Sequence, residues 1–378
     1  MGDVVPAPWG GYFVTGFEAC SQVLRGRDWL VPDFAWQDRQ PDPGRWQAPA
    51  TQEMSTTLSR LNAPVHTCQR RSLGNLFDRS TIEDMRPQVE EHVVRLLDNL
   101  EEQLRTHPEA DFVSIVSEQL PISTIGHWLD IPAQHYAHIL DITHRQVHAQ
   151  ELLPTKRELA ISAEATIQLR SFFTDLIRLR RAQPGNDVLS EWIRHWDEQL
   201  PGNRAEADQI LYSLTMFITI ASLETTATLL SSALWLLLDD PARWAWLREH
   251  PEHVGDAIDE ALRYDPPIHL NSRVAANDTV LAGVPIAKDS MVHVLYGAAN
   301  HDPRRNPDPA TFDVLRSGTH LTFGGGAHYC LGAALARLEA HILLTQLLKR
   351  FPTLQLGSAP VYAPRMVFRR VTSLKVTT

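Results

Sequence analysis

The sequence predicts a mainly α protein, with one large helical domain and a minor strand-rich part. First, no Gly or Pro interrupts residues 203–240, and the centre of this stretch is almost entirely apolar. Second, apolar side chains recur at three- and four-residue spacing, at Val89, Val93, Leu96, Leu97, Leu100 and Leu104. Third, short strands and turns replace this period over 272–296 and again after residue 353. Hydrophobic residues make up 43% of the 378 residues, which is enough for a large core.

Local patterns define the elements of the first half of the chain. Residues 10–31 predict a short strand followed by an amphipathic helix around 18–24, whereas residues 32–50, rich in Pro, Trp and Gln, predict a loop. Helices follow over about 63–119, 117–129 and 134–182. Pro154 breaks the last of these, and Pro184-Gly185 closes it.

The long helix, over about 205–238, has two interpretations. One is a membrane span, but Glu224 interrupts the apolar run, which is shorter than the roughly 20 residues that a span needs. The other is a helix of about 50 Å buried through a domain, which accounts better for a helix that is apolar on all sides. We therefore expect no membrane association.

The second half of the chain continues the same architecture. A helix over 254–264 ends before Asp265-Pro266-Pro267, a loop rich in Asp and Pro covers 300–318, and a helix covers 331–351. No internal repeat is evident. We expect residues 1–378 to form a single domain.

Charge and cysteine content exclude several classes of protein. The formal net charge is −10, which argues against a nucleic-acid-binding protein but permits a local basic patch for an acidic protein partner. The cysteines, Cys20, Cys68 and Cys330, give neither a disulfide framework nor a Cys-x-x-Cys pair. The N-terminal residues show no signal peptide. These features favour a protein of the reducing cytoplasm.

The stretch Phe323-Gly-Gly-Gly-Ala-His-Tyr-Cys-Leu-Gly332 carries the most chemistry. Its glycines allow unusual backbone conformations and close approach to a flat ligand. Cys330 stands where a helix begins, and the positive helix end favours a thiolate, a strong ligand for haem iron. A buried structural cysteine, a phosphate loop and a zinc site are the alternatives. The glycine run, the absence of a phosphate-loop motif and the lack of further zinc ligands favour haem.

This stretch resembles the haem-binding signature of the cytochrome P-450 family, F-x-x-G-x-[HR]-x-C-x-G, and the chain resembles the soluble bacterial type. Each specified position matches, at Phe323, Gly326, His328, Cys330 and Gly332. The resemblance implies the cytochrome P-450 fold and one haem b, with the loop 323–332 supplying Cys330 as the metal ligand. It also implies that Phe323 packs beside the thiolate and that His328 bonds a haem propionate.

A second segment, Ala221-Ser-Leu-Glu-Thr-Thr226, resembles the A-G-x-[DE]-T-T element of the same family. An acid followed by an alcohol in an apolar helix can relay protons, so we expect Glu224 and Thr225 to be catalytic. The alternative is that these side chains only satisfy backbone groups. Ser222 stands where the family usually has Gly, and its hydroxyl can bond back to a carbonyl one turn earlier and bend the helix.

Three further residues are candidates for binding the haem. His66 and Arg70 lie one helical turn apart and resemble the family's H-T-x-x-R segment, and Arg273 resembles a strand arginine near a propionate. Propionates need cationic or donor partners. Each residue alone would be read as an ordinary surface residue, but together with His328 they form a coherent set.

The pair Glu260 and Arg263 resembles the family's E-x-x-R motif, which is structural. The family often supplies a further arginine just before a Phe-Asp pair, and this sequence has Thr311 there. Arg304 or Arg305 is a candidate to replace it.

The resemblance implies a monooxygenase that inserts one oxygen atom from O2 into a bulky, largely apolar organic substrate, in secondary-metabolite biosynthesis. Electrons would come from NAD(P)H through a ferredoxin or similar carrier, which could dock on a basic face that includes Arg70, Arg71 and Arg337. The substrate could be tethered to a carrier. Candidate substrate contacts are Trp46, Met216, Ile220, Ser222, Ile268, Leu270 and Met366. The alternatives are epoxidation, aryl coupling or peroxide-driven chemistry, and a non-catalytic haem sensor.

Overall fold

The computed structural model describes residues 2–40, 44–74 and 76–378. The chain divides into two compact units. The first unit comprises residues 1–31, 79–120 and 225–378, and the second comprises residues 32–78 and 121–224. The long helix α11 (Arg204–Leu238) contributes to both units, because the boundary between them falls inside it.

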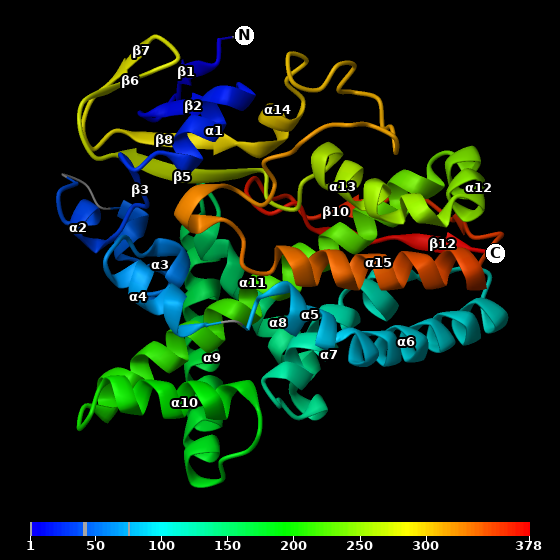
Figure 1. The fold of residues 1–378 in the computed structure, drawn as a ribbon, viewed down its shortest axis with the longest axis horizontal. Helices are drawn as coiled ribbons and strands as arrows, with labels where there is room; N and C mark the ends of the chain where they lie inside the picture. The colour runs from blue at the N-terminus through cyan, green and yellow to red at the C-terminus, as the bar shows by residue number, and fades with distance from the viewer. Residues whose placement is uncertain (1, 41–43, 75) are drawn as a thin grey trace. The chain divides into compact units, whose positions relative to one another are not determined.

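A five-stranded sheet in the first unit joins the beginning of the chain to its second half (Figure 1). Its strand order is β1-β2-β8-β5-β3, with bounds Val4–Pro6, Tyr12–Val14, Met291–Leu295, Leu270–Ala275 and Trp29–Leu30. Strands β2 and β8 run parallel, and the other neighbours are antiparallel. Helices α1 (Phe17–Arg25) and α14 (Tyr296–Asn300) bury an apolar core against this sheet.

The other helices of the first unit pack around α15 (Ala333–Arg350), drawn in orange in Figure 1. Its neighbours are α5 (Arg79–Asp84), α6 (Arg86–Thr106), α12 (Pro241–Glu249) and α13 (Val254–Tyr264). The stripe at three- and four-residue spacing predicted on α6 is buried, apart from Leu104. A short π-helical segment, η3 (Val113–Ser117), and a 3-10 turn, η6 (Pro251–His253), complete this group.

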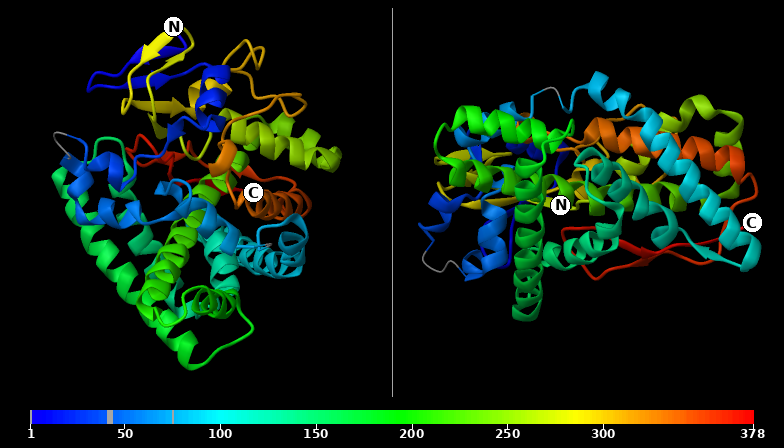
Figure 2. Two further views of the ribbon diagram at one scale, coloured as in Figure 1. Left: turned by 60° about the vertical axis from the view of Figure 1, so that its left-hand side comes forward. Right: turned by 90° about the horizontal axis from the view of Figure 1, so that it is seen from below.

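Three small sheets complete the first unit among the described residues. One has the order β4-β12-β9, with bounds Ala110–Asp111, Lys375–Thr377 and Gln355–Leu356. Another pairs β10 (Val361–Tyr362) with β11 (Val371–Ser373). The third is the hairpin of β6 (Thr279–Leu281) and β7 (Val284–Ile286), drawn in yellow in Figure 2.

The second unit is helical. Its helices are α2 (Phe34–Gln37), α3 (Pro49–Ser55), α4 (Val65–Ser72), α8 (Tyr136–Gln146), α9 (Lys156–Ala182) and α10 (Val188–Gln199), with part of α7 (Gln119–Trp128). Short 3-10 turns are η1 (Gly44–Gln47), η2 (Leu58–Arg60), η4 (Ala133–His135) and η5 (Val147–Gln150). A capping box between Thr155 and Glu158 fixes the start of α9, which packs against α8.

Helix α11 is apolar on all sides. Among the described residues it is the one helix whose length and composition would suffice to cross a membrane, and 72% of its most apolar window is buried within the protein. A helix buried in the core of a domain also has this length and composition, so these two properties are weak evidence for a membrane span.

The prediction of a mainly α protein with a minor strand-rich part is confirmed. The helix expected over 254–264 has those bounds in α13, and the long helix begins one residue before its predicted start. The expected loop over 32–50 was wrong in part, because α2 and η1 lie within it and α3 begins there, while residues 41–43 lie outside the described residues. Helices this short give no periodic signal in a sequence.

Candidate active site

The loop that carries Cys330 closes on itself through its backbone. The N–H of Cys330 donates to the carbonyl of Phe323, with 2.9 Å between N and O. Inside the loop, Gly324 and Gly326 have φ values of 72° and 65°, which side chains rarely adopt. The exposed Cys330 therefore sits at the end of a closed turn.

The glycine at 326 also permits close packing against helix α1. A Cβ on Gly326 would lie 2.7 Å from the carbonyl oxygen of Leu24 and 3.0 Å from the Cα of Arg25. The sequence suggested that these glycines let a flat ligand approach, but at Gly326 the group that approaches is the C-terminal end of α1. A glycine in a sequence can indicate that the backbone there approaches another group closely, but it does not identify that group.

Helix α15 begins just after Cys330. Gly332 is its N-cap residue, and its carbonyl accepts the N–H of Ala336 at 2.9 Å. The first N–H groups of a helix have no partner within it and carry partial positive charge. Cys330, three residues before the first helical residue, is therefore close to a helix end that favours an anion, as the sequence predicted.

Arg273 supplies a buried cation in the same unit. Its side chain is 3% exposed, on β5, and its guanidinium donates to the carbonyl of its neighbour Ser272 at 2.9 Å. Within residues 2–40, 44–74 and 76–378, no carboxylate lies within ion-pair distance of it. Burial lowers the pKa of Arg273. A buried guanidinium without a counter-ion is unfavourable, so this residue fits an anionic ligand.

Tyr296 lies near both Arg273 and the cysteine loop. Burial raises the pKa of Tyr296, and the nearby Arg273 guanidinium opposes this rise. Its hydroxyl oxygen would lie 3.7 Å from a Cβ on Gly324 in the loop. An exposed thiol in a closed loop and a buried, uncompensated cation form a donor set that fits a haem with its carboxylate groups.

The other predicted haem contacts lie on separate elements. His328 ends the 3-10 turn η7 (Gly326–His328). His66 is buried and Arg70 is half-buried, one turn apart on α4 in the second unit. Their roles toward haem remain sequence-based proposals.

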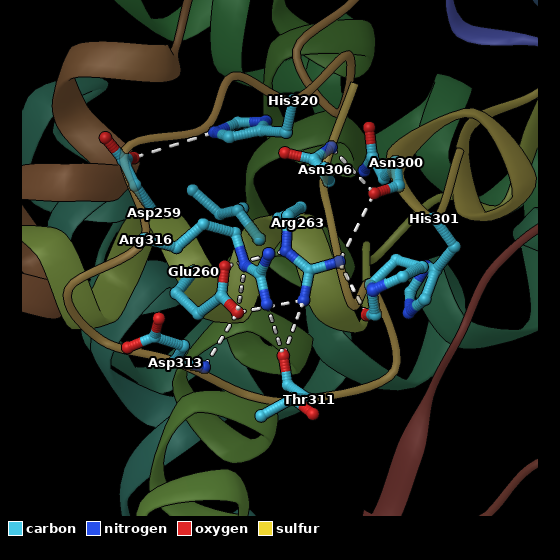
Figure 3. A network of polar contacts seen from close by, with 12 residues as sticks. Asp259, Glu260, Arg263, Asn300, His301, Asn306, Thr311, Asp313, Arg316 and His320 are labelled. Atoms are coloured by element: carbon cyan, nitrogen blue, oxygen red, sulfur yellow. Dashed lines mark hydrogen bonds and ion pairs between the residues drawn. The ribbon is translucent and has the colours of Figure 1, made fainter. Parts of the chain in front are cut away.

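Glu260 and Arg263 form a buried ion pair on α13 (Figure 3). Two hydrogen bonds of 2.7 and 2.8 Å join the guanidinium to the carboxylate, and both side chains are almost fully buried. The pair also holds the loop after α14, because Arg263 donates to the carbonyls of Asn300 and Pro309 and the carboxylate of Glu260 accepts the N–H of Asp313.

The third member of this network is Arg316 (Figure 3). Its Nε lies 3.2 Å from Oε1 of Glu260, and its guanidinium also donates to the carbonyl of Thr311 at 2.8 Å. The prediction that Arg304 or Arg305 replaces the missing arginine was wrong. Arg304 pairs with Asp3 and Asp302, and Arg305 bonds the hydroxyl of Thr319. An arginine five residues after Thr311 reaches the carboxylate because the intervening loop turns back.

Glu224 has a histidine beside it. The side chain of Glu224 is 2% exposed on α11, and its Oε1 lies 3.4 Å from Nδ1 of His144 on α8. Both residues belong to the second unit. Thr225 follows directly on the helix and is half-buried. An acid in an apolar helix thus has a titratable partner, which suits a group that takes up and releases a proton.

Ser222 makes the bond that its position predicts. Its hydroxyl donates to the carbonyl of Ile218, one turn earlier, at 2.7 Å. That carbonyl normally accepts only a helical N–H, so the hydroxyl competes for it.

The candidate substrate contacts are divided between the two units. Trp46, Met216, Ile220 and Ser222 belong to the second unit, and Ile268, Leu270 and Met366 to the first. Met216 is fully buried, with its Sδ accepting the hydroxyl of Tyr212 at 3.0 Å, whereas Met366 is 48% exposed. The Trp46 ring meets that of Trp36 edge-on and lies under the Arg45 guanidinium. These assignments remain proposals.

Two residues were missed. His144 lies 80 positions before Glu224, and no spacing rule connects them. Arg316 was missed because the family pattern places the arginine at Thr311. The sequence did contain one signal, since Arg316 is the next arginine after that position.

Comparison with known proteins identifies one family. The family model described as Cytochrome P-450 matches residues 181–360. A biotin-biosynthesis cytochrome P-450 of Bacillus subtilis (strain 168) is 30% identical over 97% of this chain and 90% of that protein. The 6-deoxyerythronolide B hydroxylase of Saccharopolyspora erythraea is 34% identical over 84% of this chain and 75% of that protein.

A solved structure of a cytochrome P-450 has the same fold as this chain. A cytochrome P-450 in complex with an acyl carrier protein ligated to hexadec-9Z-enoic acid superposes with a TM-score of 0.88. It is 29% identical in sequence, and the match covers 97% of this chain and 92% of that one.

Proposed function

The chain belongs to the cytochrome P-450 family and has its fold. From that premise we propose that it is a monooxygenase that inserts one oxygen atom from O2 into a bulky organic substrate. The observation that carries the proposal is the closed loop that presents Cys330, together with the buried, uncompensated Arg273 in the same unit. We also propose that residues 1–378 work as a single domain, because α11 belongs to both compact units.

Cys330 would hold the iron of haem b, and the cationic and donor residues would hold its propionates. Arg273 and His328 are the candidates in the first unit, and His66 and Arg70 are the candidates in the second. A propionate would supply the counter-ion that the buried guanidinium of Arg273 needs. When bound, haem with a thiolate ligand supplies the reductive activation of O2.

The protein supplies protons and orientation. We propose that Glu224 carries a proton at its carboxylate and passes it to the hydroxyl of Thr225, while Nδ1 of His144 holds Oε1 of Glu224 in place. Ser222 would take part in shaping the helix at the same turn through its bond to Ile218.

The proposal also covers the partners. Electrons would come from NAD(P)H through a ferredoxin or similar carrier in the cytoplasm, which suits a sequence whose three cysteines give no disulfide framework. A carrier-tethered substrate is supported by the structural relative that is bound to an acyl carrier protein. Secondary-metabolite biosynthesis is supported by the hydroxylase of Saccharopolyspora.

The test is the spectrum of the reduced protein with carbon monoxide. A strongly red-shifted Soret band, the mark of thiolate ligation, is expected in the native protein and is expected to vanish in Cys330→Ala. Cys68→Ala is the matched control, since Cys68 is exposed as Cys330 is. A well-folded protein that binds no haem, or that shows a carbonmonoxy band of the histidine-ligated kind, would contradict the proposal.

A second experiment separates oxygen-driven from peroxide-driven chemistry. With a compound that shifts the spin state, Thr225→Ala is expected to divert NAD(P)H into peroxide, whereas turnover driven by added peroxide is expected to persist. Turnover with peroxide alone in the native protein would favour the peroxide-driven alternative, and no turnover with any oxidant would favour a haem sensor.

A further inference from the structure

A second set of side chains surrounds Phe323, outside the signature itself. The guanidinium of Arg337, on α15, lies over the Phe323 ring at 4.5 Å from its centroid. On the segment before the loop, the ring of His320 lies 5.7 Å from that of Phe323, centroid to centroid. Phe323 is thus in contact with one cation and one titratable ring.

One carboxylate holds both of these groups. Oδ1 of Asp259, on α13, lies 2.8 Å from Nε of Arg337 and 3.6 Å from Nε2 of His320 (Figure 3 shows the contact with His320). The side chain of His320 is 9% exposed, so its position is fixed by packing as well as by charge. Asp259, His320 and Arg337 are called the Asp259 bracket below.

The bracket acts on the residue that closes the cysteine loop. The carbonyl of Phe323 accepts the N–H of Cys330 at 2.9 Å, so a shift of Phe323 moves the backbone of Cys330. The cation over the ring is attracted to its face. Asp259 fixes where that cation lies and balances its charge.

We propose that Asp259 is a positioning residue for the thiolate ligand: through Arg337 and His320 it holds Phe323, and thereby Cys330, and it sets the charge near the iron. This inference rests on the proposed function. It extends that function to a carboxylate that lies outside the signature and contacts neither Cys330 nor any proposed haem ligand directly.

The bracket could instead be an ordinary surface ion pair, because the Asp259 side chain is 50% exposed and pairs of this kind contribute little to stability. The backbone near the loop has an independent anchor on the same helix, since the hydroxyl of Thr322 donates to the carbonyl of Leu262 at 2.7 Å. If that anchor alone fixes the loop, removal of the Asp259 charge should change neither the ligand nor its potential.

The test compares Asp259→Asn with Asp256→Asn in the haem-loaded protein. Asp256 lies on the same helix, is exposed and pairs with His253, so both variants remove one negative charge from α13. Two quantities are measured: the reduction potential of the iron, and the rate at which the carbonmonoxy complex loses its thiolate-type Soret band in mild denaturant.

For Asp259→Asn we expect a more positive reduction potential, because loss of a negative charge favours the added electron, and a several-fold faster loss of the thiolate-type band. Asp256→Asn should keep the native values, and Asp259→Glu should restore both. If either quantity in Asp259→Asn equals that of Asp256→Asn, the inference is overturned. A native protein that never shows the thiolate-type band refutes the proposed function instead.

Discussion

The buried carboxylates of Glu260 and Glu224 have partners of different kinds and at different distances. Glu260 meets two arginines, with bonds of 2.7 and 2.8 Å to Arg263 and 3.2 Å to Arg316. Glu224 meets His144 at the longer distance of 3.4 Å. Arginine is always charged, whereas histidine titrates near neutral pH. The difference teaches that the first carboxylate has permanently charged partners, whereas the partner of the second can itself gain or lose a proton.

The largest expected effect is the loss of stability when Glu260 is replaced. Glu260→Gln leaves the buried Arg263 without its counter-charge, so the free energy of unfolding should fall by about 3–5 kcal/mol. Chemical denaturation of the haem-loaded protein measures this. Asp313→Ala is the control, because it keeps the backbone N–H that Glu260 accepts. Equal stability of the native protein and Glu260→Gln would show that the pair is not structural.

On the Glu224 side the expected effect is catalytic. Glu224→Gln should lower coupled turnover about 100-fold, because a positioned proton-transfer group typically contributes at least that much. The measurement is product formed per NAD(P)H with a compound that shifts the spin state. Glu206→Gln, in the exposed first turn of the same helix, should keep native turnover. Native coupling in Glu224→Gln would leave Glu224 with a packing role only.

A smaller loss of stability is expected when Arg316, the third member of the network, is replaced. Arg316→Ala removes charged hydrogen bonds to Glu260 and to loop carbonyls, so stability should fall by about 1.5–3 kcal/mol. Thermal or urea unfolding measures it, with Arg305→Ala as the control, since the Arg305 guanidinium bonds the hydroxyl of Thr319 and lies outside the Glu260 network. If the two variants were equally stable, Arg316 would not be the third member of the network.

His144 tests whether the partner of Glu224 matters. His144→Ala should reduce coupling by less than Glu224→Gln does, because the acid remains and only its orientation is lost. The ratio of peroxide to product measures the loss. His138→Ala, one to two turns earlier on α8, is the control. A loss in His144→Ala as large as in Glu224→Gln would mean that His144 itself carries the proton.

The smallest expected effect concerns acid stability. Burial tends to raise the pKa of Asp265, but His269, Arg369 and Ser232 together hold it below its usual value. A depressed carboxyl pKa stabilises the fold above the unfolded value of about 3.9 and loses this effect as pH falls through the folded value. The stability gap between the native protein and Asp265→Asn should therefore be full at neutral pH and shrink below about pH 4. A gap independent of pH would contradict the ionic role.

The sequence was sufficient for the fold class and for the helix that begins just after Cys330, because each of these depends on local pattern. The roles of Cys330, Glu224 and Thr225 stay predictions. Long-range pairing was not accessible. His144 meets Glu224, and Arg316 meets Glu260, only after loops of unpredictable path fold back. Gly326 shows the same limit, since its conformation could be inferred but not the identity of its neighbour, α1.

The N-terminal residues are connected to the loop before Cys330. Asp3 accepts two hydrogen bonds from Arg304, and Asp302 in turn accepts the N–H of Phe17 at the start of α1, the helix on which Gly326 packs. Truncation of this end, or fusion of a bulky tag to it, is therefore expected to disturb the contacts that support the cysteine loop. Such a preparation is expected to bind less haem for reasons unrelated to the ligand itself.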